Sequence, residues 1–241
     1  MENKKENLAV SVLICLMFAS IVALALWKEE RLPASPDGKS HPAINNGGAE
    51  ALYLKLGDLG REMVEAGVID KEKFLEIYAV NPEMIESGKK LLEEKNVRVA
   101  LGEDNSHLLL NYLWALGLGN KNEILEKGEM MDPRYGGASN FASTGGWTLG
   151  KGGAMDHYSM HKFITLSSRE QALVDKVSRN IYRPCCRNSA HFPDCNHGMA
   201  MLGFLELAAS QGASEREMYD GALALNSYWF PETREAGCGT S

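Results

Sequence analysis

The sequence predicts an all-α protein: an N-terminal membrane helix followed by one extracytoplasmic helical domain with a long glycine-rich loop. Three observations lead to this prediction. Residues 8–27 form an apolar run, several later segments carry apolar residues at helical spacing, and strand-like alternation is nearly absent. The chain has 241 residues and a formal net charge of −7 without a basic tract, so nucleic acid and anionic lipid surfaces are poor partners.

The N-terminal run at 8–27 is twenty residues long, and its only polar side chains are two serines. A helix needs about 20 apolar residues to cross roughly 30 Å of hydrocarbon. Ala23 and Ala25 provide an A-x-A-like cleavage site, so a cleaved signal peptide is the alternative. We favour an uncleaved anchor at 1–27, because the run continues through Trp27 without a polar region. We therefore expect a prokaryotic single-pass membrane protein whose domain lies outside the cytoplasm.

The residues after the anchor divide into a tether and a domain. Residues 28–48 contain three prolines, three glycines and few apolar side chains, which is typical of a flexible tether. The remaining residues, 49–241, are enough for one domain with a hydrophobic core.

Four helices are expected in the first half of the domain. Apolar residues recur at i, i+4, i+7 and i+11 from Leu52, which predicts an amphipathic helix over 49–66. Asn81 followed by Pro82 is an N-cap with proline at the first helical position, so a helix begins there and runs to about residue 95. The other two are expected at 70–79 and at 105–117, the latter apolar on nearly every face and therefore central.

The helical period is absent from residues 132–153, DPRYGGASNFASTGGWTLGKGG, which we interpret as a long glycine-rich loop. Loops of this length in compact domains are usually functional or disordered. Tyr135, Phe141 and Trp147 indicate that this loop packs against the domain. Its glycine pairs lack the lysine and helix start that follow a phosphate-binding loop, so nucleotide binding is not expected.

Three further helices are expected in the second half. Capping boxes at 167–170 and 214–217 predict two helices. The first covers 168–182, and the second begins after Ser214 and ends before Pro231. Between them, residues 197–210 are apolar nearly all round apart from Glu206, which predicts a buried helix with one carboxyl group that needs a polar partner.

The segment at 184–197, PCCRNSAHFPDCNH, holds three of the five cysteines and two of the six histidines. Cys185, Cys186, Cys195 and His197 have the residue types of a four-coordinate site for copper(I) or zinc. The spacing lacks the usual C-x2-C pair, and adjacent cysteines tend to point apart. Cys195 and His197 lie at the start of the expected buried helix, where free amide groups and the helix dipole favour a thiolate.

Other polar residues of this segment can complete or orient the site. His191 and Asp194 are candidate ligands or partners of ligands. Arg183 and Arg187 flank the cysteine pair and would favour thiolates.

A second cluster, AMDHYSMH, places Met155, His157, Met160 and His161 close together. If the segment is helical, the two histidines share one face and can share an ion. No glutamate follows the first histidine, so this is not the H-E-x-x-H motif of zinc peptidases. Methionine mixed with histidine suits copper better than zinc, so we expect a second or completing set of ligands.

Two other functions use the same cysteines. In an exported domain, Cys185 or Cys186 can form disulfides with Cys195 or Cys238, which would make the protein a disulfide-stapled interaction module or accessory subunit that contacts a partner through 132–153. A thiol oxidoreductase that uses Cys195 is the enzyme alternative, but the chain has neither a C-x-x-C motif nor a βαβ pattern.

Residues 181–220 resemble a known family. The "PCC" at 184–186, the later "DC", and "GMAMLGFLELAASQGASEREMYD" resemble membrane-anchored bacterial and archaeal proteins of unknown function named for a PCYCGC motif. This chain lacks the further cysteines of that motif. The resemblance implies an exported, cysteine-rich helical module suited to metal binding. We therefore predict a membrane-tethered protein that binds or hands on a soft metal ion, copper before zinc, and is not an enzyme.

Overall fold

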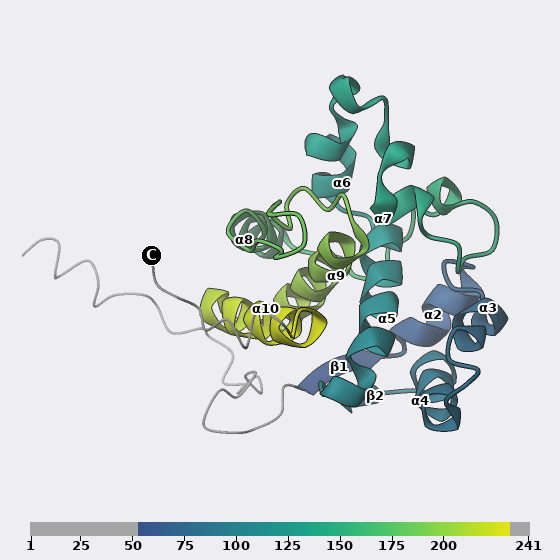
Figure 1. Ribbon diagram of the computed structural model, residues 1–241. Helices are drawn as coiled ribbons and strands as arrows, with labels where there is room; N and C mark the ends of the chain where they lie inside the picture. The colour runs from purple at the N-terminus through teal and green to yellow at the C-terminus, as the bar shows by residue number, and fades with distance from the viewer. Residues whose placement is uncertain (1–52, 232–241) are drawn as a thin grey trace, which may run out of the picture. The chain divides into compact units, whose positions relative to one another are not determined.

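The computed structural model describes residues 53–231 (Figure 1). The expected anchor at 8–27, the tether at 28–48, and Cys15 and Cys238 lie outside the described residues. None of the helices among residues 53–231 has the length and apolar character that a membrane crossing requires. The helical prediction is confirmed in its main part, because the described residues form nine α-helices and one two-stranded sheet.

The helices and strands follow one another along the whole described segment. The strands are β1 (Tyr53–Gly57) and β2 (Val97–Ala100). The α-helices are α2 (Leu59–Glu65), α3 (Lys71–Glu76), α4 (Pro82–Glu93), α5 (Ser106–Gly119), α6 (Glu123–Lys127), α7 (Ala142–Gly145), α8 (Ser168–Ser178), α9 (Asn196–Ser210) and α10 (Glu215–Trp229). Short 3-10 helices lie at Glu103–Asn105, Glu129–Met131, Pro133–Tyr135, Ala138–Asn140 and Ala154–Asp156.

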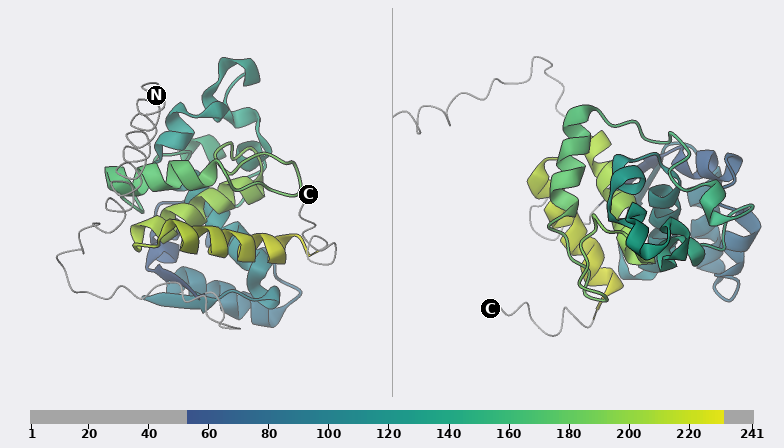
Figure 2. Two further views of the ribbon diagram at one scale, coloured as in Figure 1. Left: turned by 90° about the vertical axis from the view of Figure 1, so that its left-hand side faces the viewer. Right: turned by 90° about the horizontal axis from the view of Figure 1, so that it is seen from above.

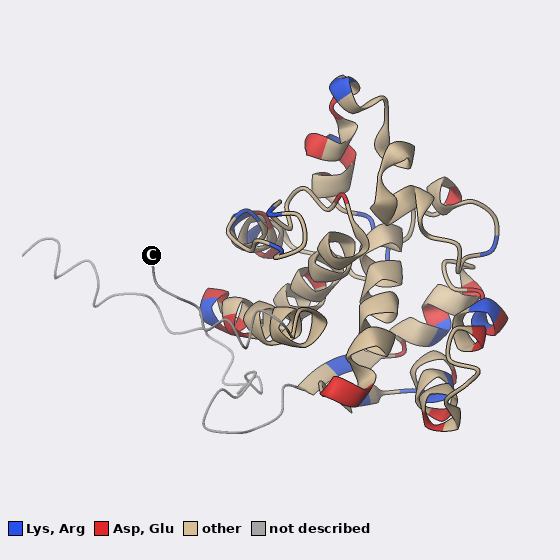
Figure 3. Ribbon diagram, viewed as in Figure 1, with Lys and Arg blue, Asp and Glu red and all other residues tan. Residues whose placement is uncertain are grey.

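The core is built around α5 and α9, the two helices whose sequences are apolar on nearly every face. Glycines let their backbones approach closely, because a Cβ atom at Gly117 would lie 2.0 Å from the Met199 carbonyl oxygen. Helices α8 and α10 pack on one side of this pair and α2 to α4 on the other (Figures 1 and 2). Charged residues of both signs are intermixed on the outer helices, whereas α5 carries none (Figure 3).

The prediction of a helix over 49–66 is wrong at residues 53–57. Residues Tyr53–Gly57 form strand β1, which pairs antiparallel with β2. Leu54 and Leu56 are buried on one face of the strand, and Gly57, with φ of 57°, ends it in the left-handed region. Only then does α2 begin. Of the residues that gave the helical spacing, Leu56 therefore belongs to the strand, and Leu59 and Met63 belong to the helix.

The capped helices agree closely with the sequence. Asn81 accepts hydrogen bonds from the first backbone N–H groups of α4, and both bonds of each capping box form at the starts of α8 and α10. Helix α8 ends at Ser178, earlier than residue 182, because the chain turns away to pair with the following loop. There, Ala190 donates a backbone hydrogen bond to Ile181.

Residues 132–153 are not a structureless loop, because they contain two short 3-10 helices and the single turn α7. The prediction that their aromatic side chains pack is confirmed. Trp147 is buried and donates a hydrogen bond to the Val68 carbonyl oxygen at 3.0 Å. The rings of Tyr135, Phe141 and Phe192 lie 5.4 Å apart, centroid to centroid, and join this segment to the connection between α8 and α9.

Candidate metal centre

A buried arginine organises the connection between α8 and α9. The side chain of Arg183 has no exposed surface, and its guanidinium pairs with the Asp194 carboxylate at 2.9 Å. It also donates to the carbonyl oxygens of Asn188, Ser189 and Phe192 at 3.1, 3.1 and 2.8 Å. The planar guanidinium group therefore holds together the residues from 188 to 194 of this connection.

The same arginine contacts the cysteine cluster. Its Nη1 group donates a hydrogen bond to Cys195 Sγ at 3.0 Å. Cys195 is the N-cap residue of α9, so helix and arginine hold this sulfur at the edge of the core. Cys195 Sγ therefore accepts a hydrogen bond from a charged donor.

Cys185, Cys186 and Cys195 come together as a group, defined here as the cysteine triad. Their sulfur atoms all lie within 4.8 Å of one another, and those of Cys185 and Cys195 are 4.0 Å apart. The expectation that adjacent cysteines point apart is wrong here. Residues 184–186 form a turn closed by a backbone hydrogen bond from Arg187 to Arg183, so neighbouring side chains do not alternate as they do in an extended chain.

Electrostatics favour the neutral thiol at Cys185 when no ion is bound. Partial burial of its sulfur atom, followed by the negative charge of Cys195 and Cys186, raises the pKa of the Cys185 thiol to about 12. Three thiolates this close repel one another, and an ion bound among them supplies the opposite charge that lets all three ionise. Cys185 and Cys186 are exposed, which gives an ion access from solvent.

His197 does not join the triad, although the sequence predicts it as a primary ligand. Its ring packs against Trp229 and Phe230, with centroid distances of 5.8 and 4.5 Å. Burial, with Arg183 and His107 nearby, lowers the pKa of His197 to about 4. Cys195 is the extended N-cap residue of α9, whereas His197 is the second residue of the helix and its ring packs on the end of α10.

His191 is also outside the triad. Its ring is buried, and Nε2 lies 2.8 Å from the Asp175 carboxylate of α8. The hydrogen bond from Arg179, more than that of His191, lowers the pKa of Asp175. The second ring nitrogen, Nδ1, is buried without a hydrogen-bond partner among the described residues.

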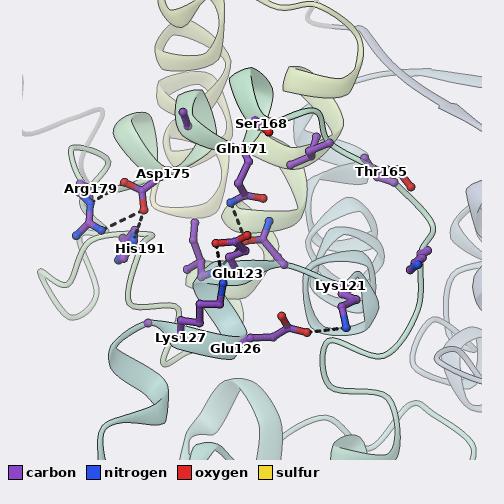
Figure 4. A pocket seen from close by; sticks show the side chains of 17 residues that line it. Lys121, Glu123, Glu126, Lys127, Thr165, Ser168, Gln171, Asp175, Arg179 and His191 are labelled. Carbon is purple, nitrogen blue, oxygen red and sulfur yellow. Dashed lines mark hydrogen bonds and ion pairs between the residues drawn. The ribbon is translucent and has the colours of Figure 1, made fainter.

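His191 and Asp175 stand at one end of a groove that the sequence analysis missed. The groove has a volume of about 810 Å³ and runs between α6, α8 and residues 162–166 (Figure 4). Its charges are largely paired, as in Lys121 with Glu126 at 3.0 Å. These residues come from segments far apart in the chain and form no motif, so no local signal identifies the groove.

Glu206 finds the polar partners that its position on a buried helix requires. The side-chain amides of Asn120 and Asn122 donate to its two oxygens at 3.0 and 2.5 Å. Burial outweighs these bonds and raises the pKa of Glu206 to about 8. The carboxyl group therefore takes part in the packing of α9 against the end of α5.

Replacing Glu206 with glutamine is expected to remove a pH dependence of stability. The folded-state pKa, about 8, lies above the ordinary value of 4.5, so the folded protein holds this proton more tightly than the unfolded chain. The resulting stability is fully present below the ordinary pKa and is lost as the pH rises through the folded pKa, with a slope of at most about 1.4 kcal/mol per pH unit. Urea unfolding across this range should show wild-type stability falling relative to Glu206→Gln. A constant difference would contradict the raised pKa.

Of the second cluster, AMDHYSMH, the structure brings the two histidines together. His157 Nδ1 lies 3.1 Å from His161 Nε2, although the segment is a 3-10 helix followed by turns and not the α-helix considered above. Met155 and Met160 are exposed, and their role as ligands stays a prediction.

Comparison with known proteins yields no match: no family model, no curated protein and no solved structure is similar to this chain. The resemblance of residues 181–220 to PCYCGC-motif proteins stays a prediction.

Proposed function

We propose that this protein binds a soft metal ion, copper(I) first and zinc second, through Cys185, Cys186 and Cys195, and that it holds or hands on the ion without catalysing a reaction. The convergence of three sulfur atoms within 4.8 Å carries this proposal. Thiolates are the ligands that copper(I) and zinc prefer among protein side chains.

The number of ligands favours copper(I) over zinc. Among the described residues, no histidine or carboxylate joins the three cysteines. A structural zinc site almost always takes four protein ligands in a tetrahedron, whereas copper(I) is satisfied by three sulfurs. Exposure of Cys185 and Cys186 suits an ion that must enter and leave by ligand exchange.

Arg183 supports this function by balancing charge. Three thiolates around one monovalent copper ion carry two negative charges, and the guanidinium 3.0 Å from Cys195 Sγ, which also pairs with Asp194, offsets part of that charge. Because the side chain is fully buried and donates hydrogen bonds to three carbonyl oxygens, we expect it to keep this position when an ion binds.

The proposed setting follows from the sequence. The apolar run at 8–27 would tether the domain to the outer face of a cell membrane, where it would meet copper or an exported protein partner. Residues 132–153 are the proposed contact with such a partner, although most of their aromatic rings are engaged in packing within the domain.

A disulfide-stapled interaction module is the second candidate, and the 4.0 Å between Cys185 Sγ and Cys195 Sγ favours it. A disulfide bond is about 2.05 Å long, so a small movement would join them if both thiols lose their protons and the two electrons pass to an external disulfide, which is reduced to two thiols. Such a bond would leave Cys186 as the sole thiol of the triad.

The two candidates predict opposite results for the full chain purified without chelator under anaerobic conditions. Copper binding predicts one copper(I) per chain in titration against a chromogenic competitor, with the three triad thiols protected from a thiol reagent in the loaded protein. Cys238→Ser is the matched control and should keep that stoichiometry. A protein that binds no copper, with only one reactive thiol in the triad, would establish the disulfide instead.

A further inference from the structure

The two histidines of the segment 157–161 are arranged as a pair outside the cysteine triad. Their rings stack with a centroid distance of 5.3 Å, and His161 stacks in turn on Phe163 at 5.1 Å. His157 is buried, whereas His161 is partly exposed, so one edge of the pair reaches solvent.

A backbone carbonyl fixes the tautomer of His157. Its Nε2 lies 2.7 Å from the Lys151 carbonyl oxygen, which can only accept a hydrogen bond. Nε2 therefore carries the hydrogen, and Nδ1 of the neutral ring presents a lone pair toward His161 Nε2 at 3.1 Å. A carbonyl partner on the far nitrogen is the arrangement that commonly orients a metal-binding histidine.

The separation of the two nitrogens matches the requirement of a shared ion. Two imidazole nitrogens in adjacent positions of a tetragonal copper(II) ion, each about 2.0 Å from the metal, lie roughly 2.8 Å apart. The observed 3.1 Å needs only a small inward movement of His161, whose ring is the more exposed.

The backbone holds the pair in this geometry. Ser159, between the histidines, adopts a left-handed φ of 56°, which is unfavourable for a residue with a side chain. Hydrogen bonds to the end of α5 maintain it: Ser159 donates to the Leu118 carbonyl oxygen at 2.8 Å and His161 to that of Gly119 at 2.9 Å. Strain held in place by surrounding contacts is frequent at ligand sites.

We propose that His157 and His161 form a second metal site, which binds a divalent ion, copper(II) foremost. Imidazole suits copper(II), and copper(II) binds nitrogen ligands most tightly among the divalent ions of the first transition row. Two protein nitrogens leave positions for water, so the ion at this site is exchangeable. The site shares no residue with the triad and takes a different oxidation state of copper.

Copper(II) titration of the full chain with Cys185, Cys186 and Cys195 all changed to serine tests this site apart from the triad. We expect one copper(II) per chain, with electron paramagnetic resonance showing coupling to two imidazole nitrogens. Changing His161 to phenylalanine in this background keeps the ring stack and should weaken binding roughly tenfold or more. The matched control is His107→Phe, an exposed histidine outside the pair, which should leave binding unchanged.

Two results would overturn the proposal: copper(II) that shows no coupling to two imidazoles, or equal affinity in the parent and His161→Phe. Circular dichroism checks that the variants are folded, and the imidazole coupling of the parent tests the site without any change to the pair. Because the variant used here lacks the cysteine triad, absence of copper(II) binding would not affect the copper(I) proposal. Absence of copper(I) binding at the triad would likewise not affect the histidine site.

Discussion

Replacing Arg183 with methionine is expected to lower the free energy of unfolding by about 3–5 kcal/mol, the range found when one partner of a buried ion pair is removed. The change leaves Asp194 without its guanidinium at 2.9 Å. It also removes the donors that reach three backbone carbonyls of the loop. Each buried acceptor left without a donor costs about 1–3 kcal/mol, so the loop 184–195 should loosen first.

Urea unfolding followed by circular dichroism measures this loss. Arg187→Met is the matched control, because Arg187 is exposed on the same loop and its replacement should change stability by no more than about 0.5 kcal/mol. Arg183→Lys keeps the charge without the planar fork and should fall between the two. If Arg183→Met unfolds with the wild-type free energy, the guanidinium does not organise the loop.

Changing Cys195 to serine is expected to reduce copper(I) affinity more than about 100-fold, because even partners that only orient a ligand contribute about 10–100-fold. The serine hydroxyl can still accept the hydrogen bond that Arg183 gives to Cys195 Sγ. Helical content should therefore remain largely intact, which separates loss of a ligand from loss of the fold.

Competition titration beside circular dichroism checks this expectation. Cys15→Ser is the control, since Cys15 is far from the triad in the chain and should have no effect on copper(I) affinity. Unchanged copper affinity in Cys195→Ser would remove Cys195 from the site.

Local signals explain which elements the sequence predicts well. The apolar character of α5 and α9 and the side-chain caps at Asn81, Ser167 and Ser214 lie within each helix, so they identify it without knowledge of the fold. Strand β1 has no such local signal. Its partner β2 lies some forty residues further along, and Leu56 of the strand also falls at helical spacing with Leu59 and Met63 of α2.

The candidate site also has parts that can be predicted from the sequence and parts that cannot. Residue type alone identifies Cys185, Cys186 and Cys195 as candidate ligands, but their spacing does not predict that they converge, because the turn at 184–186 brings the adjacent pair together. From the sequence, Arg183 is only a charged residue that flanks the cysteine pair. Its burial could not be predicted, because it depends on the carbonyl oxygens that the folded loop turns toward it. His197 is drawn away by Trp229 and Phe230, which belong to the end of another helix.

X-ray absorption at the copper edge of the copper(I)-loaded full chain tests the central claim most directly. The proposal predicts one copper ion surrounded by three sulfur atoms, contributed by the triad whose sulfurs lie within 4.8 Å of one another. A first shell of nitrogen or oxygen without sulfur, or a protein whose triad is oxidised and retains no copper(I), would contradict it. The cysteine cluster would then be a structural staple.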